Sequence, residues 1–147
     1  PEKNVILNDG FCPTHEAIEL AEIEAARAEH PGARVLAHPE CGDWVLKEAD
    51  FVGSTSQIIA EAVASDATDF IIATVHGVIR ELEAQTAGTG KRFWFPRTTP
   101  ICPNMARVTA EKVLACLRDG TGEVSLPDDA VATGSARALD LMLDYAK

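Results

Sequence analysis

Residues 51–73 read FVGSTSQIIAEAVASDATDFIIA, and the order of patterns in this stretch predicts the fold. The apolar pair Phe51-Val52 and the apolar run Phe70–Ala73 are too short for buried helices and are typical of strands covered on both faces. Between them, residues 54–57 have the S-x-x-Q form of a capping box and open a helix over 55–65. A strand, a helix and a second strand in succession predict a βαβ unit with parallel strands.

The same alternation continues on both sides of this stretch. Further short apolar runs predict strands at Val5–Leu7, Val35–Ala37 and Phe93–Phe95. Helical spacing of apolar residues predicts helices over 13–29, 77–86, 103–118 and 128–146, and a short helix within 41–49. The sequence therefore predicts an α/β fold: a three-layer αβα unit with a small parallel sheet, followed by C-terminal helices.

Composition narrows the class of protein. The chain has 147 residues, the length of one domain or of a domain with an appendage, and 46% of them are hydrophobic. Its net charge of −10 makes it a poor non-specific binder of nucleic acid or of an anionic membrane surface. No apolar run is long enough to span a bilayer, and four scattered cysteines without a CxxC pair indicate a reducing compartment. We expect a cytoplasmic protein with no nucleic-acid or membrane partner.

Reactive side chains gather where the predicted strands end. Parallel sheets bind ligands at the carboxyl ends of their strands, so these residues are expected on one rim. The rim would hold Cys12, His38, Glu40, Ser54, Thr55, Thr74, His76 and Cys102. Of these we expect His76 to be merely exposed.

Two thiols on this rim share one local arrangement. Cys12 and Cys102 each precede a proline that suits the first position of a helix. A cysteine at a helix N-terminus is stabilised as thiolate, the form that binds metal or attacks carbon. The alternative is two buried cysteines that act as small hydrophobic side chains. Cys116 lies within an amphipathic helical pattern and is predicted to be a core residue.

The remaining candidates have equally plain alternatives. His38 and Glu40 flank a proline, which suits general acid–base work or an open metal site, or else a surface turn. Ser54 and Thr55 follow a glycine at a new helix N-terminus, which suits an anion site or simple capping. His15 lies three residues after Cys12 and is either part of the same site or a solvated surface histidine.

Together these segments resemble quinolinate synthase, the iron–sulfur enzyme of NAD biosynthesis. The matching stretches are GFCPTH at 10–15, HPEC at 38–41, ADFVGSTSQ at 49–57 and CPNM at 102–105. The resemblance runs from about residue 4 to the C-terminus and covers the C-terminal half of the family's chain. It implies three αβα units around a [4Fe–4S] cluster, with one cysteine ligand from each unit.

The resemblance also implies a role for each part of this chain. Residues 1–101 would form one αβα unit with the substrate site and the second cluster ligand, Cys12. Residues 102–147 would form a helical extension with the third ligand, Cys102. The first ligand would come from the remaining N-terminal part of the enzyme, which is the expected protein partner. Cys41 matches the family motif, but the resemblance gives it no ligand role.

Roles carry over residue by residue. His38 and Glu40 resemble the catalytic pair beside the open iron, and both would also contact substrate. His15, Ser54 and Thr55 resemble residues that bind substrate. Val75 departs from the resemblance, because many relatives have a glutamate there.

The implied reaction joins iminoaspartate to dihydroxyacetone phosphate. Phosphate and two waters leave as the pyridine ring of quinolinate closes. We expect the chain to be inactive alone, since two thiolates hold a [4Fe–4S] cluster poorly. One alternative is a metal-free small-molecule-binding or docking domain that keeps the fold without catalysis. Another is a thiol nucleophile at Cys12 with His15 as its base.

Overall fold

The computed structural model describes the chain except for residues 1–5, 7–9, 97–99, 126–127 and 147. It consists of two compact units, residues 1–106 and 107–147. The α/β fold predicted from the sequence is confirmed. The expected strand at Val5–Leu7 lies outside the described residues, apart from Ile6, which belongs to no strand.

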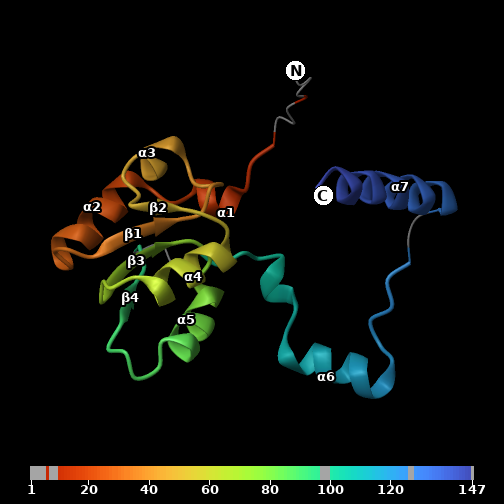
Figure 1. Cartoon of the computed structure of the whole chain (residues 1–147). Helices are drawn as coiled ribbons and strands as arrows, with labels where there is room; N and C mark the ends of the chain where they lie inside the picture. The colour runs from red at the N-terminus through yellow and green to blue at the C-terminus, as the bar shows by residue number, and fades with distance from the viewer. Residues whose placement is uncertain (1–5, 7–9, 97–99, 126–127, 147) are drawn as a thin grey trace. The chain divides into compact units, whose positions relative to one another are not determined.

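The first unit is built on a parallel sheet of four strands (Figure 1). The strands are β1 (Arg34–Ala37), β2 (Phe51–Val52), β3 (Asp69–Ala73) and β4 (Arg92–Trp94), in the order β2-β1-β3-β4. Each matches a predicted apolar run to within a residue or two. The βαβ prediction for 51–73 is correct in direction, although β1 lies between β2 and β3 in the sheet.

Helices cover both faces of this sheet, which gives the three-layer arrangement visible in Figure 1. On one face, α2 (Leu20–Glu29) and α3 (Asp43–Leu46) pack on side chains such as Val35 and Ile71. On the other, α4 (Thr55–Ala64) and α5 (Ile79–Gln85) pack on side chains such as Leu36 and Ile72. These four strand residues are fully buried, because successive side chains point to opposite covered faces.

The strand order creates a switch point between β1 and β3. From β1 the chain passes through α3 to β2 on one side. From β3 it passes through the 3₁₀ helix η1 (His76–Val78) and α5 to β4 on the other side. The connections after two neighbouring strands thus diverge, and the crevice at their carboxyl ends is where such sheets bind ligands. The backbone pairing continues past the strands, since the His38 N–H donates to the Ala73 carbonyl at 3.1 Å.

The predicted helix over 13–29 is two helices in the structure. The first, α1 (Pro13–Glu16), is separated from α2 by an extended residue, Glu19. Glu19 caps α2 in a reciprocal capping box with Glu22, whose carboxylate accepts the Glu19 N–H at 3.2 Å. Glutamate is not among the preferred N-cap residues, so no local pattern signals this break.

The capping box predicted for α4 is confirmed. The Ser54 N–H donates to the Gln57 side chain at 2.8 Å, and the Gln57 N–H donates to the Ser54 hydroxyl at 3.4 Å.

The second unit is helical. It contains α6 (Ala110–Asp119), which Thr109 caps, and α7 (Asp129–Tyr145), which Asp128 caps. The 3₁₀ helix η2 (Met105–Arg107) precedes α6, so the helix predicted over 103–118 begins later than expected. Cys116 is exposed on α6, and its prediction as a core residue is wrong. None of the helices in the described part of the chain is long and apolar enough to cross a membrane.

Candidate functional site

A cavity of about 590 Å³ lies at the switch point of the sheet. It collects six of the seven side chains that the sequence singled out as site residues. These are Cys12, His15, His38, Glu40, Thr55 and Cys102. Ile59, Val75, Gly77, Val78, Glu81 and Met105 complete the lining. The thiols, the imidazoles and the carboxylate therefore line one cavity.

Ser54 is the predicted site residue that does not line this cavity. It is exposed, and its hydroxyl accepts the Gln57 N–H as the N-cap of α4. The capping interpretation is thus correct for Ser54, while Thr55, the first residue of the helix, faces the cavity.

His15 is the best-anchored residue of the site. Its exposed fraction is 6%, so the alternative of a solvated histidine is wrong. Its Nε2 lies 3.0 Å from the hydroxyl of Thr74, which is fully buried directly after β3. Its Nδ1 lies 3.3 Å from Cys12 Sγ and 3.2 Å from Glu40 Oε2. One imidazole nitrogen is held by the scaffold, and the other faces a thiol and a carboxylate.

His38 and Glu40 form a second contact beside it. The His38 ring stacks on His15 with centroids 4.2 Å apart and planes 9° from parallel. Glu40 donates its N–H to His38 Nδ1 at 3.2 Å, and its Oε2 lies 3.5 Å from the same nitrogen. Because His38 Nδ1 accepts a hydrogen, its Nε2 carries the ring proton in the neutral form. Pro39 lies in the turn that joins these two residues, and both of their side chains line the cavity.

The electrostatics of the site favour a neutral His15. Burial lowers the pKa of His15 below its ordinary value of 6.5, and the neighbouring His38 lowers it further. Glu40 acts in the opposite direction. The imidazole thus offers a lone pair, which is the form that accepts a proton or binds a metal.

Cys102 is held in surroundings that stabilise thiolate. The backbone N–H groups of Met105 and Asn104 lower the pKa of the Cys102 thiol, and the Thr14 hydroxyl adds to this. Thr14 belongs to α1, the helix that follows Cys12. Backbone N–H groups therefore stabilise the Cys102 thiolate as expected, although they belong to the turn that leads into η2 (Met105–Arg107) and Pro103 is not the first residue of a helix.

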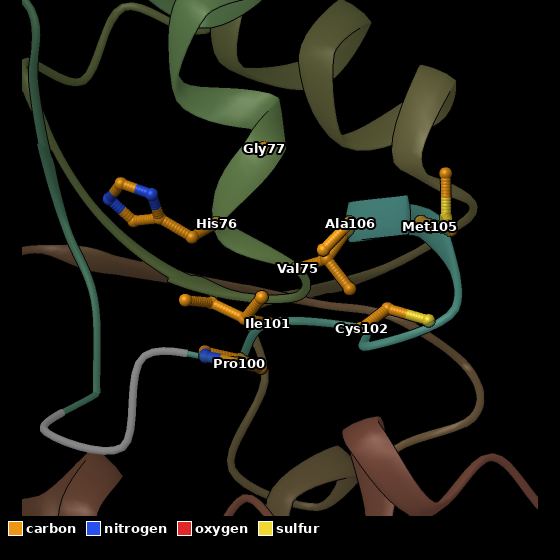
Figure 2. A pocket seen from close by; sticks show the side chains of 8 residues that line it. All are labelled: Val75, His76, Gly77, Pro100, Ile101, Cys102, Met105 and Ala106. Carbon is orange, nitrogen blue, oxygen red and sulfur yellow. The ribbon is translucent and has the colours of Figure 1, made fainter. Parts of the chain in front are cut away.

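A second, smaller cavity adjoins Cys102. Its volume is about 400 Å³, and its lining includes Val75, Ile101, Cys102 and Met105 (Figure 2). Figure 2 shows the His76 ring turned away from Cys102, on the opposite side of Val75. His76 is exposed, as predicted, although it lines the same cavity as Cys102. Val75 lines both cavities.

The donor set can be compared with the ligands of a metal group. Among the described residues, Cys12, His15 and Glu40 offer ligand atoms that all lie within 4.8 Å of one another. For an iron–sulfur cluster, Cys12 and Cys102 line one cavity and fit two thiolate ligands. Cys41 does not fit as a third. It is buried and donates its S–H to the Ala73 carbonyl at 3.3 Å, and burial raises the pKa of its thiol to about 11.

Thr74 is the site residue whose role the sequence did not indicate. Its position after an apolar strand placed it on the rim, but nothing local pointed to a histidine 59 residues away. The two meet only in the folded chain, where His15 of α1 lies against the residue that follows β3.

Comparisons with known proteins agree on one family. The family model described as quinolinate synthetase A protein matches residues 1–144. The quinolinate synthase of Caldicellulosiruptor saccharolyticus is 40% identical over 146 residues, which is 99% of this chain and 47% of the relative. That of Fusobacterium nucleatum is 39% identical over 98% of this chain and 47% of its own length. Quinolinate synthase 2 of Methanosarcina acetivorans is 37% identical over 99% of this chain and 46% of its own. The chain spans about half the length of the curated relatives it matches.

Proposed function

This chain belongs to the quinolinate synthetase A family, and from that premise we propose that its cavity is part of a quinolinate synthase active site. The reaction would join iminoaspartate to dihydroxyacetone phosphate, releasing phosphate and two waters, as a step of NAD biosynthesis. The observation that carries the proposal is the convergence of two thiols and a histidine–glutamate pair on one cavity.

Cys12 and Cys102 would be two of three cysteine ligands of a [4Fe–4S] cluster. Three ligands leave one iron open, which supplies a Lewis acid for substrate oxygens when the cluster is bound. The thiolate-stabilising N–H groups around Cys102 support this assignment. The third thiolate would come from the remaining N-terminal part of the enzyme, our proposed protein partner.

Proton transfer falls to Glu40 and His38. Glu40 Oε2 lies 3.2 Å from His15 Nδ1, so a proton on this carboxylate has a neighbouring acceptor. His38 would turn its Nε2–H toward a substrate oxygen, because its Nδ1 already accepts the Glu40 N–H. His15 would hold this pair in place through its stacking contact and its bond to Thr74.

The N-terminus of α4 would bind the anionic groups of the substrates. Thr55 lines the cavity there, beside backbone N–H groups that favour a carboxylate or phosphate. A chain with a net charge of −10 needs such local positive potential to hold anionic substrates. Ser54 would contribute through its capping of the same helix.

The division into an αβα unit over 1–101 and an extension over 102–147 remains a prediction. So does the expectation that the chain is inactive alone, since the proposed cluster needs a third thiolate.

A metal-free binding domain is the second candidate, and Val75 favours it. An apolar side chain lines the cavity where many relatives have a glutamate, so the chain could keep the fold without catalysis. A third candidate is a thiol nucleophile at Cys12 with His15 as its base, which the contact between these two side chains supports.

The decisive experiment joins this chain to the N-terminal half of a relative. Residues 1–147 would replace the matching half of the Caldicellulosiruptor saccharolyticus quinolinate synthase, and the fusion would be reconstituted anaerobically with iron and sulfide. We expect bound iron and quinolinate formation. Cys12→Ser and Cys102→Ser should each lose iron, whereas Glu40→Gln should keep iron and lose turnover.

Two results would count against the proposal. Full iron retention in either cysteine variant would reject the ligand assignment. A folded fusion without a brown chromophore would favour the metal-free domain. Cys116→Ser, on the exposed face of α6, is the matched thiol control and should behave as the unmodified fusion.

A further inference from the structure

We propose that Cys12, His15 and Glu40 form a site for one divalent cation of the zinc class, which the chain binds without Cys102. This inference rests on the geometry of three side chains and does not require the iron–sulfur cluster. It concerns the state of the chain when a complete cluster is not assembled.

Two of the three distances between ligand atoms match a single tetrahedral ion. A Zn–S bond of about 2.3 Å and a Zn–N bond of about 2.0–2.1 Å place sulfur and nitrogen about 3.5 Å apart, and a nitrogen and a carboxylate oxygen about 3.4 Å apart. The observed separations are 3.3 Å from Cys12 Sγ to His15 Nδ1, and 3.2 Å from this nitrogen to Glu40 Oε2. All ligand atoms lie within 4.8 Å of one another.

The second contact of the histidine fixes the ligand atom. His15 Nε2 lies 3.0 Å from the buried Thr74 hydroxyl, so Nε2–H can donate to Oγ1 and leave the Nδ1 lone pair toward Cys12 and Glu40. Metal-binding histidines commonly have their other ring nitrogen held in this way. The stacked His38 ring further limits rotation of the imidazole.

The chemistry of the donors selects the kind of cation. A thiolate, an imidazole and a carboxylate suit Zn²⁺ and its neighbours, whereas Mg²⁺ and Ca²⁺ prefer oxygen alone. Three protein ligands leave a fourth position, which would face the cavity that these residues line. An open fourth position is typical of zinc sites that bind a water or a small anion.

Cobalt(II) added to the reduced 147-residue chain under anaerobic conditions tests the site. Co²⁺ takes the same ligands and gives a near-ultraviolet thiolate charge-transfer band. We expect one Co²⁺ per chain, displaced by one Zn²⁺. The band should survive Cys102→Ser and Cys116→Ser, and disappear in Cys12→Ser. Thr74→Val should weaken Zn²⁺ binding about 10- to 100-fold, and Thr74→Ser should restore it.

The outcomes separate this proposal from the cluster proposal. A band that persists in Cys12→Ser, or that is lost equally in Cys102→Ser, overturns the three-ligand site. Failure of iron incorporation in the fusion leaves the cobalt result unaffected, and the reverse also holds. The Glu40→Gln variant tests the site without a risk of misfolding, because the Glu40 side chain is half-exposed. This variant should bind Co²⁺ more weakly and keep the circular dichroism spectrum of the unmodified chain.

Discussion

Replacing Thr74 by valine removes the hydrogen bond that holds His15. Thr74 is fully buried and its Oγ1 lies 3.0 Å from His15 Nε2, while valine has nearly the same shape. The main loss is then a partner for a buried imidazole nitrogen, which costs about 1–3 kcal/mol of unfolding free energy. A matched substitution, Thr74→Ser, keeps the hydroxyl and should cost less.

Tryptophan fluorescence in a urea titration measures this loss. The chain has two tryptophans, Trp44 and Trp94, and both lie in the first unit, so the signal follows that unit. With an m-value of about 2 kcal/mol/M, the expected loss shifts the midpoint by about 0.5–1.5 M. Repeating Thr74→Val in a His15→Leu background isolates the contact, because replacing both polar partners by apolar groups can be nearly neutral.

Two results would refute this reasoning. The first is a Thr74→Val midpoint equal to that of the unmodified chain. The second is the same loss in the His15→Leu background as in the unmodified background. The second result would show that Thr74 stabilises the fold without acting through the histidine.

Three further measurements follow from the structure. Lys91→Met should lower the free energy of unfolding by about 1–2 kcal/mol in the same titration, because Lys91 Nζ donates to three carbonyls at the end of α4, at 2.6, 2.9 and 2.6 Å. An unchanged midpoint would contradict this, and substitution of an exposed lysine, Lys47→Met, is the control. Alkylation near pH 8 should label Cys102 well before Cys41, because the pKa of the Cys102 thiol is lowered while burial raises that of Cys41 to about 11 and leaves about 0.1% of Cys41 as thiolate. Equal labelling rates by mass spectrometry would contradict this. Acidification below pH 6.5 should destabilise the first unit, because burial and then His38 keep the pKa of His15 in the folded chain below its value in the unfolded chain. The contribution of a neutral His15 to stability is therefore complete above pH 6.5 and is lost as the pH falls. In His15→Leu the free energy of unfolding should depend less on pH.

Local patterns in the sequence were enough for the strands and for one helix start. The strands are short apolar runs because both faces of the sheet are covered, and Ser54 with Gln57 is a cap that depends on neighbouring residues alone. The break before α2 was not predicted, because it uses Glu19 as its cap. The separation of β2 from β3 was not predicted either, since strand order depends on how the crossover helices pack.

The candidate site was predictable as a rim, but not as a set of contacts. The rule that parallel strands end at one edge is enough to place Cys12, His38 and Cys102 in one group from the sequence alone. It could not tell that Thr55 faces the cavity while Ser54 faces solvent. Nor could it show that His15 is buried against Thr74, because that contact depends on how α1 packs beside the end of β3.

The bond from the His38 amide to the Ala73 carbonyl has a consequence for how homologous chains can differ in length. An insertion or deletion between Ala37 and Glu40 would displace the imidazole by about 3.3 Å along the ladder, beyond the reach of its neighbours. The turn at 86–90 lies at the opposite edge of the sheet, and its Gly88 and Gly90 have positive φ angles and open space around them. Gaps in an alignment of this family should therefore collect in that turn and avoid the segment after β1.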